Sequence, residues 1–172
     1  MSSSLKFYGA ILNISSKFIY FMNTKDFWTP HNLERCSFLW SEVRLLVAAL
    51  TLILGTTPVI FLLLPISTLY SILRLGVAIA WLISGVSSAY LLYRWSMGNK
   101  MLFNGTDTKD RVAFLVSVIS GLNLGIVGLL GTNIGMSISS DRVVLLIVAV
   151  LYIVSAVHLH KRWKGNGQKL FS

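Results

Sequence analysis

Hydrophobic positions along the chain fall into four long runs separated by short polar segments. A helix needs about 20 apolar residues to cross a bilayer, and the runs at 45–64, 75–93, 112–136 and 143–158 reach or approach that length. None of these four ranges contains a charged residue, and arginines lie at their edges, as is typical of membrane boundaries. The pattern predicts an all-α polytopic membrane protein whose four transmembrane helices form a bundle.

The first 43 residues are too polar to cross a membrane and too apolar to form a solvated tail. On a helix at about 100° per residue, Lys6, Asn13 and Lys17 share one side, whereas Leu12 and Phe18 lie on the other. Such a pattern is typical of an amphipathic helix in the headgroup region. Packing against a partner subunit is the alternative interpretation.

A second helix is predicted to start at Thr29-Pro30, where an N-cap residue precedes proline at the first helical position. It is expected to run as a helix towards Arg44. The predicted organisation is therefore an interfacial segment at 1–43, a transmembrane domain at 44–160 and a basic tail at 161–172.

Composition and charge place these helices in a membrane with a defined orientation. Hydrophobic residues make up 55% and charged residues 12% of the 172, against about 45–50% and 25% in soluble domains. Thirteen of the 15 Lys and Arg residues lie in the amino-terminal segment, the loop between the second and third spans, and the tail. The positive-inside rule then predicts an inner or plasma membrane location with both termini cytoplasmic.

The net charge of +9 is assigned to anionic lipid headgroups and not to nucleic acid, because the basic residues lie in short segments between apolar runs. Bound lipid is expected. In the tail, Lys161, Arg162 and Lys164 are the predicted headgroup contacts, alongside the interfacial ring of Trp163.

Glycines are concentrated at 121–135, within the third span. On a helix, small residues of this span share an arc of about 80°, and a second row spaced by four follows the second span. In lipid, close backbone approach across such residues is a main source of helix association. The two rows are predicted to pack together. The alternative is a glycine-lined path or a surface for a flat cofactor. The rows consist of Ser117, Gly121, Gly125, Gly128, Thr132 and Gly135 in the third span, and of Gly76, Ala80, Ser84 and Ser88 in the second.

Several polar positions interrupt the apolar runs. The side-chain amides of Asn123 and Asn133 need partners in hydrocarbon, and another helix, a neighbouring subunit or a ligand could supply them. Pro58 predicts a kink in the first span. At 104–111, an aspartate or threonine is expected to cap the third span, with Asp110 near the positive end of its dipole.

Candidate chemistry is sparse. No Asp, Glu or Lys lies within the four expected ranges, which disfavours proton-coupled transport. Cys36 is the single cysteine, so no internal disulfide is possible. His158 and His160 would point about 200° apart on a helix, so they cannot hold one metal from one face, although His158 could be an axial ligand to a pigment. No cofactor is predicted.

These observations favour a non-catalytic structural or accessory subunit of a larger membrane complex, with other membrane subunits or further copies of the chain as partners. The alternative is a channel or transporter for a small solute, an ion or a lipid, lined by Pro58, Asn123, Asn133 and the glycine face. A haem- or pigment-binding subunit that uses His158 is the third hypothesis.

Overall fold

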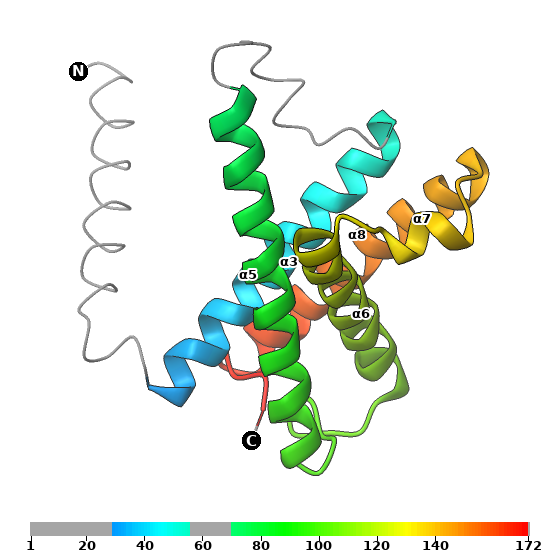
Figure 1. Cartoon of the computed structure of the whole chain (residues 1–172). Coiled ribbons are helices and arrows are strands. Elements are labelled where there is room, and N and C mark those ends of the chain that lie inside the picture. Colours follow the sequence, from blue (N-terminus) through cyan, green and yellow to red (C-terminus); the bar gives the residue numbers. More distant parts are fainter. Residues whose placement is uncertain (1–28, 56–69, 172) are drawn as a thin grey trace, which may run out of the picture. The chain divides into compact units, whose positions relative to one another are not determined.

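The computed structural model describes residues 29–55 and 70–171, which contain five helices and no β-strand (Figure 1). The predicted amphipathic segment, Pro58 and the end of the first expected span lie outside these residues. All the helices except α7 are long and apolar enough to cross a membrane, so the predicted four-helix membrane fold is confirmed. The helices are α3 (Pro30–Leu54), α5 (Tyr70–Met97), α6 (Thr108–Leu130), α7 (Ile134–Ile138) and α8 (Arg142–Gly165).

The chain divides into two compact units, residues 1–34 and 35–172, and the packing described below lies within the second. Helix α3 begins at Pro30, as the Thr29-Pro30 pair predicts, and continues without a break to Leu54. The transmembrane domain was expected to begin at residue 44, where charged residues precede the apolar run. Instead, Glu42 and Arg44 lie within the helix and are buried in the bundle, with exposed fractions of 7% and 6%. A polar side chain that faces other helices does not end a span.

Helix α3 ends where α8 begins. The Arg142 guanidinium, at the start of α8, donates to the carbonyl of Leu52 at 2.8 Å and to that of Ile53. Cations are favourable at a helix carboxyl end, where the last carbonyls lack partners within the helix. Arg142 therefore ties the ends of two helices together.

The third expected span also differs, because α6 stops at Leu130 and not at Met136. Gly131 takes a left-handed conformation with φ of 70°, and its N–H bonds to the Val127 carbonyl. Asn133 then caps the short helix α7. Glycine at a helix carboxyl end and asparagine at an amino end are strong local signals, and here they outweigh a continuous apolar run. Thr132 and Gly135 consequently lie beyond the end of α6 and outside its row of small residues.

Helices α5 and α6 pack through glycines at their closest approach. A Cβ added to Gly125 would lie 2.7 Å from the Gly85 Cα, and one added to Gly85 would lie equally close to the Gly125 Cα. Gly128 faces Leu82 in the same contact. Both backbones therefore approach to a separation that no side chain permits, as in other small-residue contacts between membrane helices.

The α5 side of this contact differs from the predicted row of small residues. Ser88 faces Gly121, but a Cβ added to Gly76 would meet nothing within 4 Å, and Ala80 is half-buried. Residues spaced by four drift about 40° around a helix at each step. A row that starts at Gly76 therefore leaves the contact, and Gly85 takes the central place.

The loop between α5 and α6 and the carboxyl-terminal tail lie at the same end of the second unit. The Phe103 N–H donates to the Leu170 carbonyl at 2.9 Å, and Phe114 and Phe171 have ring centroids 6.1 Å apart. Phe38 of α3 reaches Trp163 at this end, with centroids 5.4 Å apart. Two of the basic segments that the charge distribution assigns to one side of the membrane are thus in contact.

Replacing Gly125 by alanine should lower the free energy of unfolding by about 1–3 kcal/mol, because the new methyl group must push the α5 backbone away. Thermal unfolding in detergent, followed by size-exclusion chromatography, measures the change. Gly76→Ala is the matched control, since it places the same methyl group in open space on α5. Equal stability of the two variants would contradict the close contact.

A buried polar cluster as the candidate functional site

Three groups of ionisable side chains connect α3, α6 and α8. They involve Asp110 of α6, Glu42 and Arg44 of α3, and residues of α8 near its carboxyl end. Charged side chains buried between membrane-length helices are rare and usually mark a functional pathway. These three groups are therefore the candidate site.

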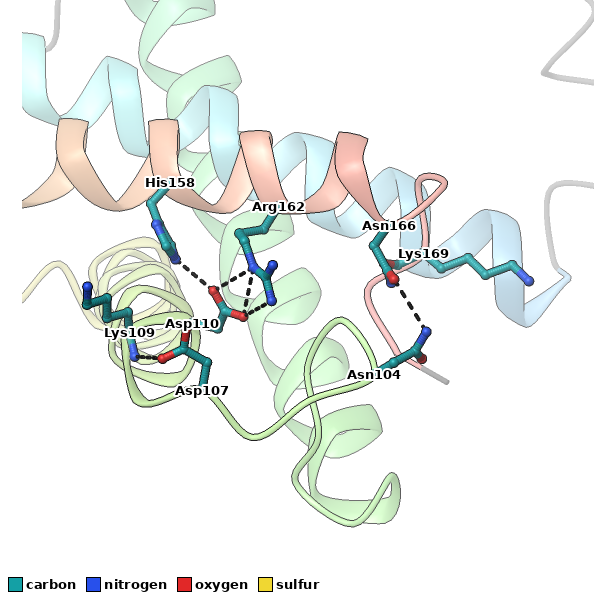
Figure 2. Close-up of polar contacts among 8 residues, drawn as sticks. All are labelled: Asn104, Asp107, Lys109, Asp110, His158, Arg162, Asn166 and Lys169. Atoms are coloured by element: carbon teal, nitrogen blue, oxygen red, sulfur yellow. Dashed lines mark hydrogen bonds and ion pairs between the residues drawn. The ribbon is translucent and has the colours of Figure 1, made fainter.

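Asp110 is fully buried and binds two side chains of α8 (Figure 2). Its Oδ1 lies 2.7 Å from His158 Nε2, and its Oδ2 accepts from Arg162 Nη2 at 2.8 Å. Arg162 Nε also donates to Oδ1 at 3.1 Å, so the guanidinium binds both carboxylate oxygens in a bidentate pair. His158 and Arg162 reach one carboxylate because residues four apart share a helix face.

The capping of α6 explains how Asp110 comes to point at α8. Asp107 is the N-cap, and its Oδ1 accepts the Lys109 N–H at 3.0 Å, as expected from the sequence. Asp110 then falls in the first turn, as predicted, but its main partners are His158 and Arg162. The helix-start interpretation was incomplete, since it missed an ion pair between two helices.

Glu42 and His160 form the second group, between α3 and α8. Glu42 Oε2 lies 2.8 Å from His160 Nδ1, and the side chains are 8% and 41% exposed respectively. The other carboxylate oxygen, Oε1, is buried and has no hydrogen-bond partner in the described part of the chain. A half-exposed histidine is therefore joined to a buried carboxylate that has one oxygen unused.

Arg44 is the third group, and it points from α3 to α6. Its Nη2 donates to the Ser117 carbonyl at 2.7 Å, and its Nη1 donates to Ser120 Oγ at 3.1 Å. No carboxylate pairs with Arg44 among residues 29–55 and 70–171. Within these ranges, the acceptors of this buried cation are neutral oxygens.

Gly121 provides the room for Arg44. A Cβ at Gly121 would lie 3.0 Å from the Arg44 Cζ and 1.9 Å from the Ser88 Oγ. The guanidinium and the Ser88 hydroxyl therefore both lie against the bare backbone of α6. Any larger residue at 121 would displace one of them.

Several polar atoms around Arg44 have no partner within the described ranges. The Arg44 Nε–H and the hydroxyls of Ser41 and Ser88 are buried without a hydrogen bond. Ser84, one turn from Ser88, is occupied because it accepts from the Trp40 indole N–H at 3.0 Å. The interior thus keeps unused donors, and each buried donor left without an acceptor costs about 1–3 kcal/mol.

The two asparagines predicted to need partners bind one another. Asn123 Nδ2 donates to Asn133 Oδ1 at 2.9 Å, and Asn123 Oδ1 accepts the Ile134 N–H at 3.0 Å. Asn133 Oδ1 also accepts the Met136 N–H at 3.2 Å. Their amides connect α6 to α7 and do not point into the polar cluster.

The basic tail residues have different environments. Lys161 and Lys164 are exposed, whereas Arg162 is committed to Asp110. Helix α8 continues to Gly165, so the expected domain boundary at residue 161 falls inside a helix. His158 binds Asp110 of α6 and His160 binds Glu42 of α3, in agreement with their predicted angular separation. The described residues contain no group of three or more His, Cys, Asp or Glu that could hold a metal ion.

Sequence reasoning missed Glu42, Arg44 and Asp110 as interior groups. One signal was available, namely the spacing by four of His158 and Arg162, which places both side chains on one face where the apolar part of the helix ends. The serines at 84, 88, 117 and 120 were a second signal. Serines in apolar helices are expected to face other helices, where their hydroxyls can form hydrogen bonds. Neither signal identifies the partner on another helix.

Asp110→Asn should lower the free energy of unfolding by about 1–3 kcal/mol, because it removes the charge that binds Arg162 and His158. Chemical or thermal unfolding in detergent tests this. Asp107→Asn is the matched control, since asparagine caps a helix about as well as aspartate, and its effect should stay within about 0.5 kcal/mol. Similar losses in the two variants would mean that the ion pair does not stabilise the bundle.

Comparisons with known proteins leave the site to be interpreted from its own geometry. No protein-family model, no curated protein and no solved structure matches the chain.

Proposed function

We propose that this protein is a proton-linked conduit or carrier for a small solute. The observation that carries the proposal is the pair of Glu42 and His160, in which a carboxylate buried within a membrane-length helix is bonded to a half-exposed histidine. Chains of Asp, Glu and His inside membrane proteins are typical of proton relays. The sequence-based argument against proton coupling assumed that no carboxylate lies within a span, and that premise does not apply to α3.

The geometry suits transfer of a proton between the surface and the interior. His160 uses Nδ1 for Glu42, so its ring is oriented by that bond while part of the side chain remains accessible. A histidine that is bonded through one ring nitrogen can exchange a proton through the other. Glu42 Oε1 is buried and has no partner in the described residues, so this oxygen is the next position of the proposed relay.

In this proposal Arg44 and Ser88 would bind the solute. The buried Arg44 Nε–H and Ser88 hydroxyl are donors without acceptors in the described ranges. A small solute with an acceptor group, anionic or strongly polar, would satisfy them. Asn123 and Asn133, which the conduit hypothesis placed along the path, are used by each other and by α7.

An accessory subunit of a membrane complex is the second candidate. The observation that favours it is the first half of α5, where Ile72 and Leu75 are 67% and 63% exposed and Gly76 meets nothing. Such a surface of apolar and small residues suits a helix of another chain. The accessory-subunit proposal expects partner chains to co-purify, whereas the conduit proposal expects protons to cross a vesicle membrane.

Proton flux into vesicles tests the conduit. In liposomes that hold the purified protein and a trapped pH indicator, a drop in external pH should acidify the interior faster than in liposomes without protein. Glu42→Gln should reduce this flux at least about tenfold, because an amide cannot take up the proton. Lys161→Gln, an exposed change beside His160, should leave the flux unchanged.

Elution profiles in detergent should show that the variants fold alike. Wild-type flux equal to that of empty liposomes, or undiminished flux in Glu42→Gln, would contradict the proposal. If wild-type vesicles are inert and stoichiometric partner chains co-purify, the accessory-subunit proposal takes its place.

A further inference from the structure

We infer that the groove between α6 and α8 binds an acyl chain of an anionic phospholipid, whose headgroup is held by Lys109. This inference is independent of the proposed function. It rests on the walls of the groove, on its position along the two helices, and on the charges at its mouth.

The groove has a volume of about 330 Å³ and mainly apolar walls. Val112 and Ala113 line it from α6, and Leu151 and Val154 line it from α8. Val112 and Val154 are 51% and 58% exposed, so the groove opens outward along the apolar surface of the helices. The volume lies at the small end of ligand sites, about 300–1,000 Å³, which suits one flexible chain better than a bulky ring system.

The polar end of the groove lies at the helix ends. Thr108 and Lys109 are the first residues of α6, and His158 lies in the carboxyl-terminal third of α8. Figure 2 shows Lys109 on the first turn of α6, on the side where His158 approaches from α8. The groove is therefore polar at the end that reaches the membrane surface and apolar further in, which is the order of a phospholipid.

The charges at the mouth favour an anionic headgroup. Asp110 is committed to Arg162 and His158, and Asp107 to the Lys109 backbone N–H. No carboxylate in the described part of the chain pairs with the Lys109 ammonium. Lys109 also lies where the dipole of α6 is positive.

The headgroup must provide the selectivity. Any acyl chain can enter an apolar groove in a bilayer, because lipid tails are as apolar as the walls. Basic positions between membrane helices are a recurrent way of selecting acidic lipids. A single lysine at the groove mouth predicts preference for a headgroup with net negative charge over a zwitterionic one of the same chain length.

Native mass spectrometry of the purified protein, incubated with equal amounts of phosphatidylglycerol and phosphatidylcholine of identical chains, tests the inference. The wild type should retain at least about five times more phosphatidylglycerol than phosphatidylcholine. Lys109→Gln should reduce the two to similar levels, and Val154→Trp, which fills the groove, should reduce both. Lys100→Gln and Val157→Trp are matched controls outside the groove and should retain lipid as the wild type does.

Equal retention of both lipids by the wild type, or an unchanged preference in Lys109→Gln, would overturn the inference. A dimer or a co-purifying helix that Val154→Trp releases, without any change in lipid, would show that protein and not lipid fills the groove, and would overturn it too. If Val154→Trp fails to fold, Lys109→Gln carries the test alone, because Lys109 is an exposed side chain.

Discussion

A guanidinium buried between membrane helices must be given acceptors and space together, and this constraint organises the second unit. Ser117 and Ser120 of α6 provide the acceptors for Arg44, and Gly121 provides the space. One turn further along α6, Gly125 meets Gly85 and holds α5 at backbone contact. The α6 glycines therefore have two separate roles, since one permits close helix approach and another admits a charged side chain and a serine hydroxyl.

The orientation of α3 follows from Arg44. Residues two apart on a helix point about 200° apart, so a helix that directs Arg44 at α6 turns Glu42 to another neighbour, where it meets His160 of α8. The same geometry on α8 directs His158 to Asp110 of α6. Polar contacts thus join α3, α6 and α8 in pairs, and the glycine contact adds α5. The proposed proton relay depends on this arrangement.

Much of the fold could be predicted from the sequence, because helix length, apolar content and local caps are encoded by neighbouring residues. The start of α3 at Pro30 and the Asp107 cap of α6 are of this kind. The end of α6 at Gly131 had a local signal too, but a continuous apolar run concealed it. The burial of Glu42 and Arg44 could not be predicted, since it depends on which neighbouring helix each side chain faces. For the same reason the sequence indicated the α6 glycine face but not its partner, Gly85.

The central claim is that α3 crosses the membrane as one helix through Glu42 and Arg44. Spin labels placed singly along residues 39–54, with Cys36→Ser as background, measure contact with lipid-soluble oxygen and with a water-soluble paramagnetic reagent. The structure predicts high oxygen contact at Val43, Val47 and Leu50, which are 58%, 48% and 49% exposed, and low contact at the buried Leu45 and Ala49. Strong contact of Val43 with the water-soluble reagent would contradict the account, because the membrane would then begin beyond Arg44.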